Sequence, residues 1–366
     1  MTLSPGVKQL QNYLEGTKTA ILNGEKIQII MGNEAADLDS MGSAVIYAYC
    51  KAMSASSDDT TIYVPMINIP REDFKLRTEA AFLFSHAGIN TDWLLFAEDI
   101  NLNALNQTGN LELVLVDHNK LASNQSELAQ TVEEIIDHHK DEQLYMDAAR
   151  VIEPVGSAAT LVAEALLKNP DALEEGSAVL LLGTILLDTV NLDPDAQRAT
   201  EKDQQIVDAL LKLTGADRKQ LFDKLQEEKF NVSSLDSSDL LRKDYKEWKL
   251  GNQNVGFASV LLSISDWLTK DADLSGSLAA YASRCKLDVL IAMNAYTQPQ
   301  FTRELVVYCK DDALRSKLLK FLEGSDLGLT KIEGAVDADT ALYAQANLGY
   351  SRKKLQPVMN DFFTSL

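Results

Sequence analysis

The chain has 366 residues, enough for two domains that each bury a core of their own. Its composition, 46% hydrophobic and 24% charged, is typical of an ordinary soluble protein, and no apolar run reaches the length of a membrane span. A net charge of -20, from 34 Lys and Arg against 54 Asp and Glu, argues against nucleic-acid or anionic-membrane binding through bulk charge.

The first half of the chain alternates strand-like runs with helix-like patterns. Apolar runs predict strands at 27–31, 61–67, 111–116, 132–136 and 149–153. Helical spacing predicts helices at 41–53, 156–168 and 177–188. Strands separated by helix-length segments indicate an α/β fold with a doubly wound, mainly parallel sheet.

The second half begins with a polar, charged stretch, 194–219, which we interpret as a connecting helix and linker. A smaller α/β region follows, with strands predicted at 254–262, 287–293 and 304–309 and a polar helix near the C-terminus. We therefore expect one domain at 1–193 and another at 220–366, with the active site in the cleft between them.

The sequence is less informative about the cellular location of the protein and about its three cysteines. The N-terminal sequence MTLSPGVKQLQNYLEG lacks the apolar stretch of a secretory signal, so we expect a cytoplasmic protein. Cys50, Cys285 and Cys309 have neither disulfide-framework nor zinc-ribbon spacing and are interpreted as packing or surface thiols.

Acidic and imidazole side chains directly follow three of the predicted strands. The segment GNEAADLDS (32–40) follows the first, Asp117-His118 follows the third, and Asp137-His138-His139 follows the fourth. The helix predicted at 177–188 ends in Asp188. Because the carboxyl ends of parallel strands meet at one edge of the sheet, these groups should converge there.

Carboxylates and imidazoles gathered at one edge need a cation among them, because they would otherwise repel or remain desolvated. Oxygen-rich ligands with one imidazole suit Mg²⁺, Mn²⁺ or Co²⁺, and no thiolate is placed to favour Zn²⁺. Two such ions can lower the pKa of a water and clamp a phosphoryl group for in-line attack. The residues themselves therefore predict a two-metal hydrolase of phosphate compounds.

Each motif also has a structural interpretation. Asp37, Asp39 or Ser40 could simply cap the helix that follows, and an isolated His-His pair is more often structural than metal-binding. The basic run SRKK (351–354) fits a solvated helix face. The coincidence of four acidic motifs at separate strand or helix ends favours the metal site.

The motifs NEAADLDS, LVDH, IIDHH, VGSAAT and ILLDT, in this order, resemble those of the DHH phosphoesterase superfamily. In the second half, DYKE (244–247) and SRKK resemble the basic motifs of the DHHA2 domain, which is found in family II inorganic pyrophosphatases and eukaryotic-type short-chain exopolyphosphatases. The resemblance covers almost the whole chain.

This resemblance implies roles for individual residues. Asp37 would bind one metal ion and Asp39 the other, Asp117 and Asp188 would touch or bridge both, and His138 would complete the second site. The expected cofactors are two divalent ions, Mg²⁺ first, with Mn²⁺ or Co²⁺ as alternatives.

The remaining roles concern the substrate. His139 would contact the leaving phosphate or give it a proton, and Lys246, Arg352 and Lys353 would bring positive charge to the phosphates. Such local cations would let a protein of net charge -20 hold a polyanion.

The first motif departs from the pyrophosphatase pattern. Those enzymes carry GHxxPDxD, whereas here Asn33 takes the place of the histidine and no proline precedes Asp37. Asn33 could bind a metal ion directly or through water, and losing an imidazole should weaken Mn²⁺ or Co²⁺ relative to Mg²⁺. Asn33 and the segment IPRED (69–73) resemble the exopolyphosphatase branch. Arg71 in that segment could contact a phosphate or pair with a neighbouring acid.

These features lead us to expect an exopolyphosphatase that releases orthophosphate from the ends of inorganic polyphosphate. The enzyme alternatives are pyrophosphate hydrolysis and the nucleotide phosphodiesterase activity associated with the related animal prune proteins, which typically have DHR where this chain has DHH. A non-catalytic protein that binds polyphosphate or a partner is a further alternative. The sequence leaves monomer and homodimer open.

Overall fold

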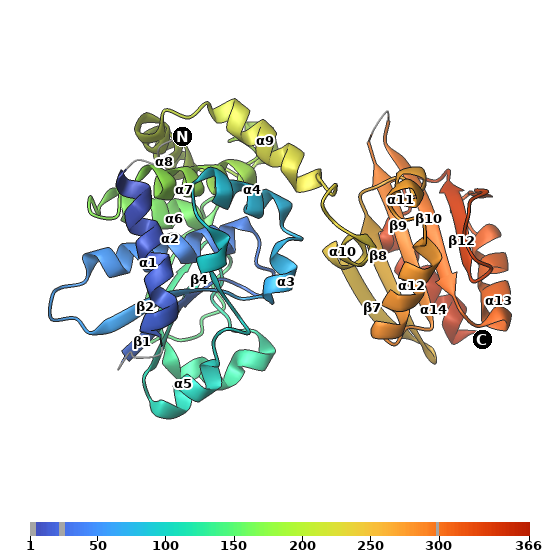
Figure 1. Cartoon of the computed structure of the whole chain (residues 1–366), viewed down its shortest axis with the longest axis horizontal. Helices are drawn as coiled ribbons and strands as arrows, with labels where there is room; N and C mark the ends of the chain where they lie inside the picture. The colour runs from blue at the N-terminus through green and yellow to red at the C-terminus, as the bar shows by residue number, and fades with distance from the viewer. Residues whose placement is uncertain (1–4, 22–25, 298–299) are drawn as a thin grey trace. The chain divides into compact units, whose positions relative to one another are not determined.

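The structure is a computed structural model that describes residues 5–21, 26–297 and 300–366. The chain divides into two compact units, residues 1–229 and 230–366 (Figure 1). No helix in the described part of the chain is both long and apolar enough to cross a membrane.

In the first unit, six strands form one parallel sheet in the order β3-β2-β1-β4-β5-β6. The strands are β1 (Lys26–Met31), β2 (Thr61–Ile67), β3 (Leu95–Phe96), β4 (Leu111–Val116), β5 (Val132–Asp137) and β6 (Ala149–Ile152). The helices are α1 (Pro5–Ala20), α2 (Leu38–Ser54), α3 (Arg71–Phe74), α4 (Thr78–His86), η1 (Thr91–Trp93), α5 (Leu102–Thr108), η2 (Ser123–Thr131), α6 (Ala158–Leu167), α7 (Glu175–Asp188), η3 (Pro194–Ala196), α8 (Glu201–Thr214) and α9 (Arg218–Phe230). The predicted parallel sheet is confirmed, except that β3 is too short to give a periodic signal.

Both faces of this sheet are buried. On β1, Ile30 faces a core that includes α2, α6 and α7, whereas Ile29 and Met31 face the core on the opposite side. A strand that is buried on both faces has a continuous apolar sequence, and such runs are easily recognised as strands. Polar side chains of the central strands are consequently gathered beyond their ends, at the edge of the sheet.

The stretch interpreted as a connecting helix and linker is packed into the first unit. Helix α8 lies against α6 and α7, where its side chains Ile206, Val207 and Leu210 are buried. Helix α9 continues the same unit and contributes buried Leu221 and Leu225 to its core. The first compact unit therefore extends through α9, well beyond the predicted boundary at 193.

The second unit contains a mixed sheet in the order β11-β12-β10-β9-β8-β7, in which only the β8–β9 pair of the described strands is parallel. Its strands are β7 (Tyr245–Leu250), β8 (Gln253–Val260), β9 (Val289–Tyr296), β10 (Thr302–Cys309), β11 (Leu329–Lys331) and β12 (Thr340–Gln345). Its helices are α10 (Ser237–Lys243), α11 (Ile264–Lys270), α12 (Leu274–Arg284), α13 (Asp312–Glu323) and α14 (Arg352–Thr364).

Helices α13 and α14 cover one face of this second sheet, and α10 and α12 pack against the other (Figure 1). The predicted strands at 254–262, 287–293 and 304–309 correspond to β8, β9 and β10. Strand β7 escaped prediction because it is an edge strand whose sequence, YKEWKL, is mostly exposed and charged.

Candidate active site

The ends of β1, β4 and β5 lie side by side, because these three strands are neighbours in the parallel sheet. A pocket of about 360 Å³ opens at this edge. It is lined by Asn33, Asp37, Asp39, Asp117, His138, His139, Val155, Gly156, Asp188 and Arg198. The structure thus brings together all five predicted metal ligands, together with Asn33 and His139.

The loop after β1 is held close to the first turn of α2. A Cβ atom on Gly32 would lie 2.6 Å from the Cβ of Ser40, so only glycine allows this approach. Asp37 is the N-cap of α2, and its side chain accepts a hydrogen bond from the backbone N–H of Ser40. The capping interpretation and the pocket position therefore both hold for Asp37.

Asp39 lies two residues later, in the first turn of α2, and is almost fully buried. Its carboxylate accepts hydrogen bonds from the backbone N–H groups of Ala158 and Ala159, at 2.6 and 2.8 Å, and thereby stabilises the N-terminus of α6. Burial and the negative charge of Asp37 raise the pKa of Asp39.

Asp117 occupies the end of β4 with a left-handed backbone conformation, φ 62°. This conformation is uncommon outside glycine and marks local strain. One carboxylate oxygen, Oδ2, accepts hydrogen bonds from Ser40 Oγ at 2.6 Å and from Asn33 Nδ2 at 2.9 Å. Ser40 and Asn33 therefore fix this oxygen and leave Oδ1 to face the pocket.

Asn33 has a supporting position in this arrangement. Its amide oxygen accepts the backbone N–H groups of Ala35 and Ala36, while its amide nitrogen donates to Asp117. Both lone pairs of the amide oxygen are engaged in these hydrogen bonds, so this oxygen is not available to a metal ion or a phosphate. Asn33 instead orders the loop and the Asp117 carboxylate.

The two histidines are held in different ways. His138 Nδ1 lies 2.9 Å from the Val155 carbonyl oxygen, which fixes the proton on Nδ1 and leaves Nε2 as the lone-pair atom facing the pocket. His139 Nδ1 lies 2.8 Å from Asp137 Oδ1, so its Nδ1–H is bound to Asp137 and its Nε2 is available elsewhere. The hydrogen bond to Asp137 raises the pKa of His139.

Asp137, which ends β5, is fully buried and acts as an anchor. It accepts hydrogen bonds from the backbone N–H groups of His138 and His139 and from the side chain of Asn119. Burial alone would raise the pKa of Asp137, but these hydrogen bonds outweigh it and lower that pKa. The Asp of the IIDHH motif therefore positions both histidines and does not line the pocket.

Asp117 Oδ1 and His138 Nε2 lie 3.2 Å apart, and Oδ1 receives no hydrogen bond when His138 is neutral. Burial alone would lower the pKa of His138, but its hydrogen bond to Asp117 and the charge of Asp39 raise it to about 10. Burial and the charge of Asp39 raise the pKa of Asp117 to about 7. Both shifts have the same origin, the burial of several carboxylates around one imidazole.

Asp188 adds a fourth carboxylate from the last residue of α7. Its Oδ2 is buried without a hydrogen-bond partner among the described residues. Burial, then the charges of Asp39 and Asp37, raises the pKa of Asp188 well above its usual value. The site thus offers four carboxylates and one imidazole Nε2, and two of the carboxylate oxygens have no hydrogen-bond partner among the described residues. These groups are suitable ligands for divalent cations.

Arg71 is not brought to this pocket. Its guanidinium donates to Asp99 Oδ2 at 2.5 Å and to the Leu94 carbonyl at 3.0 Å, and it stacks on the ring of Phe96. Of the two interpretations of Arg71, the structure therefore shows the ion pair with a neighbouring acid.

The predicted basic residues of the second unit lie near one another. Lys246 is exposed on β7, and Arg352 and Lys353 begin α14. Arg352 donates to the carbonyl of Asp244 at 2.7 Å and to its carboxylate at 2.6 Å, which ties the start of α14 to the residue before β7. Lys246 thus lies on a strand against which α14 packs, and Arg352 and Lys353 lie at the start of that helix.

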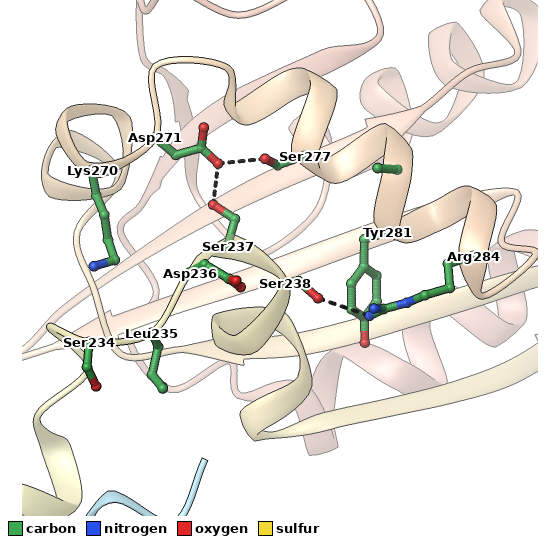
Figure 2. A pocket seen from close by; sticks show the side chains of 11 residues that line it. Ser234, Leu235, Asp236, Ser237, Ser238, Lys270, Asp271, Ser277, Tyr281 and Arg284 are labelled. Atoms are coloured by element: carbon green, nitrogen blue, oxygen red, sulfur yellow. Dashed lines mark hydrogen bonds between the residues drawn. The ribbon is translucent and has the colours of Figure 1, made fainter. Parts of the chain in front are cut away.

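The second unit also has a larger pocket, about 630 Å³, between α10, α11 and α12 (Figure 2). Asp271 accepts hydrogen bonds from Ser237 and Ser277, and Arg284 donates to Ser238. Lys270 donates to the carbonyl of Ser233. These polar side chains of the pocket have hydrogen-bond partners, whereas buried oxygens of Asp117 and Asp188 in the acidic pocket have none among the described residues.

Several residues of the site were not found in the sequence. Ser40 was considered only as a cap, Asn119 follows LVDH without any motif of its own, and Arg198 lies in a polar stretch that was assigned to a linker. Their roles depend on contacts between segments far apart in the chain, for which a single sequence gives no signal.

Comparison with known proteins follows the division into two parts. Residues 27–187 match the model of the DHH family, N-terminal domain, and residues 223–362 match that of the DHHA2 domain. The chain is 37% identical over 363 residues to exopolyphosphatase PRUNE1 of Rattus norvegicus, covering 96% of this chain and 79% of that protein.

Two further relatives show the range of similarity. Exopolyphosphatase PRUNE1 of Homo sapiens is 34% identical over 360 residues, 96% of this chain and 79% of that protein. A manganese-dependent inorganic pyrophosphatase of Methanothrix thermoacetophila is 24% identical over 268 residues, 72% of this chain and 79% of that protein. The resemblance inferred from the motifs is confirmed: this chain belongs to the DHH family, in the group that carries a DHHA2 domain after the DHH domain.

Proposed function

We propose that this protein is a metal-dependent phosphoanhydride hydrolase that releases orthophosphate from the ends of inorganic polyphosphate. The observation that carries the proposal is the acidic pocket itself, in which Asp37, Asp39, Asp117 and Asp188 surround His138, with Asp117 Oδ1 and His138 Nε2 3.2 Å apart. Relatives named exopolyphosphatase, more than 30% identical over nearly the whole chain, support the choice of substrate.

In this proposal Asp37, Asp39, Asp117, Asp188 and His138 hold two divalent ions. Mg²⁺ is the expected ion, and Mn²⁺ or Co²⁺ are the alternatives, since a relative is named as manganese-dependent. When bound, such ions lower the pKa of an attacking water and neutralise charge on the transferred phosphoryl group. Ser40 and Asn33 fix the orientation of the Asp117 carboxylate, and the N-terminus of α6 fixes that of Asp39. These buried carboxylates would therefore hold the ions in fixed positions.

His139 has the geometry of a proton donor. Asp137 binds its Nδ1–H and stabilises the charged imidazolium, which leaves an Nε2–H to donate to the oxygen of the leaving phosphate. Its side chain is 57% exposed, so a substrate can reach it. Ligand atoms of Asp117, His138 and His139 lie within 4.8 Å of one another, and Asp137 engages the Nδ1 atom of His139.

Lys246, Arg352 and Lys353 are proposed to bind the negatively charged phosphate chain. Polyphosphate carries roughly one negative charge per phosphate, so exposed ammonium and guanidinium groups favour longer chains. The bond between Arg352 and Asp244 fixes the guanidinium and reduces the entropy lost on binding.

Pyrophosphate hydrolysis is the second candidate, because it would use the same carboxylates and His138. The 24% identical relative named as a pyrophosphatase favours it. Nucleotide phosphodiester hydrolysis and non-catalytic binding of polyphosphate or a partner are weaker alternatives, since the intact acidic pocket is suited to attack on a phosphoanhydride.

The test is orthophosphate release from pyrophosphate, tripolyphosphate and long-chain polyphosphate, each with Mg²⁺, Mn²⁺ or Co²⁺. We expect kcat/KM to rise from two phosphates to longer chains, because longer chains carry more negative charge for the proposed cations Lys246, Arg352 and Lys353. Faster cleavage of pyrophosphate than of tripolyphosphate would favour the second candidate. Absence of release from all three would refute the proposal and direct the search to nucleotides and binding partners.

A further inference from the structure

Arg198 lies in the acidic pocket, on the segment between η3 and α8. Among the described residues that line this pocket it is the one lysine or arginine. The other lining residues are carboxylates, histidines, Asn33, Val155 and Gly156. A single guanidinium therefore accompanies four carboxylates at the candidate metal site.

The backbone around Arg198 is held firmly. The preceding Gln197 has a left-handed conformation, φ 52°, and the following Thr200 forms a capping box with Asp203 at the start of α8. The carbonyl oxygen of Arg198 lies against Gly156, where an added Cβ would come within 2.8 Å of it. The base of the arginine side chain is thus fixed beside the segment that carries Val155 and Gly156.

The same segment also positions His138, since the Val155 carbonyl binds His138 Nδ1. Arg198 and the imidazole of the proposed metal site are therefore anchored to adjacent residues of one loop. The loop that holds Arg198 therefore also holds a residue of the proposed metal site, where a phosphoryl group would bind.

The Arg198 side chain is exposed and makes no ion pair or side-chain hydrogen bond with any residue in the described ranges. Other arginines form ion pairs with acids. These pairs include Arg71 with Asp99, Arg150 with Asp141, Arg315 with Asp312, and Arg352 with Asp244. In a chain with 20 more acidic than basic residues, an arginine that remains unpaired beside four carboxylates has all its N–H donors available for a ligand.

We infer that Arg198 binds the oxygens of the phosphoryl group that is cleaved, as a substrate-binding residue contributed by the first unit. A planar guanidinium can give two parallel N–H bonds to a phosphoryl group, whereas the carboxylates around it repel that anion. This inference rests on the proposed function. It differs from the roles given to Lys246, Arg352 and Lys353, which concern the rest of the phosphate chain.

The test compares wild type with Arg198→Ala and Arg198→Lys, with Lys212→Gln as control. Lys212 is exposed on α8, and its replacement removes the same unit of charge away from the pocket. We measure steady-state hydrolysis of tripolyphosphate and, independently, the binding of orthophosphate by calorimetry in the presence of Mg²⁺. The unfolding temperature of each metal-free protein completes the set.

For Arg198→Ala we expect kcat/KM and orthophosphate affinity each to fall about tenfold to a hundredfold, as for a lost charge-assisted hydrogen bond. Arg198→Lys should recover only part of this loss, because lysine keeps the charge but not the bidentate geometry. Lys212→Gln should match wild type in both measurements.

A different pattern would overturn the inference. If Arg198 only offsets the charge of the carboxylates, Arg198→Ala will unfold at a lower temperature without metal and bind Mg²⁺ more tightly, with unchanged orthophosphate affinity. If wild type hydrolyses no polyphosphate but Arg198→Ala loses orthophosphate affinity, the proposed function fails and the assignment of Arg198 as a phosphate-binding residue stands.

Discussion

At the scale of single residues, the site depends on side chains that are held by their neighbours. Asp137 binds both backbone N–H groups of the histidine pair and fixes the ring of His139, whereas the Val155 carbonyl fixes the ring of His138. The adjacent histidines therefore present their free nitrogens in different surroundings. Because a different partner holds each ring, these neighbours in sequence can have separate roles.

Asp117 is the residue whose loss should be most damaging. Replacing it by alanine removes the carboxylate proposed to contact both metal ions, so we expect activity to fall by several orders of magnitude. Phosphate release from tripolyphosphate measures this effect, with metal binding by calorimetry alongside it. An Asp117→Ala protein as active as wild type would show that hydrolysis takes place elsewhere.

The three cysteines should differ in reactivity. Burial raises the pKa of Cys50 to about 12 and that of Cys309 to about 11, whereas Cys285 is partly exposed. Only the thiolate reacts, and a pKa of about 11 leaves on the order of one thiolate in a thousand thiols at pH 8. We expect one rapidly labelled thiol per native chain, measured with a chromogenic disulfide reagent.

The other two thiols should react only after denaturant is added. Replacement of Cys285 by serine gives the control, since it should abolish the fast phase alone. Rapid labelling of all three thiols in the native protein would contradict the burial of Cys50 and Cys309.

At the scale of elements, α8 is more than a connection. Its residue Asp203 is fully buried and accepts hydrogen bonds from the Gly156 N–H, from Thr160 Oγ1 at 2.5 Å and from both the N–H and hydroxyl of Thr200. One carboxylate therefore joins α8, α6 and the loop that lines the acidic pocket. Gly156 allows this close approach, because a Cβ there would lie 2.5 Å from Thr189.

Replacing Asp203 by alanine should lower the free energy of unfolding by about 2–4 kcal/mol, because several buried donors lose their acceptor. Urea unfolding measures this loss. Asp208→Ala is the matched control, since Asp208 is exposed on the same helix and its loss should cost less than about 0.5 kcal/mol. Equal stability of the two variants would show that the Asp203 contacts contribute little.

At the scale of the whole molecule, the two units have separate cores and separate chemistry. The proposed metal ligands all belong to residues 1–229, and the cations Lys246, Arg352 and Lys353 all belong to residues 230–366. A metal ion without substrate should therefore stabilise only the first unit.

Hydrogen exchange can detect this difference. At 100 times its dissociation constant, Mg²⁺ should stabilise the unit that binds it by about 2.7 kcal/mol, which slows the slowest amides of β1, β4 and β5 roughly a hundredfold. Peptides from 230–366 should exchange as they do with a chelator present. Equal protection of both units would show that they unfold as one cooperative body.

The sequence alone determined the parallel sheet, the main strands of both units, the family and the group of acidic and imidazole residues. These signals are local: apolar runs mark strands buried on both faces, and the motifs Asp117-His118 and Asp137-His138-His139 follow them directly. Parallel topology then brings the ends of the strands together without further information.

Only the tertiary structure decided the contacts between distant segments. It paired Arg71 with Asp99, engaged the Asn33 amide within its loop and with Asp117, and packed α8 into the first unit through Asp203. It also placed Arg198 in the acidic pocket. The periodicity of a sequence reports which side of an element is buried, but the partner of a charged side chain depends on which remote segment packs beside it.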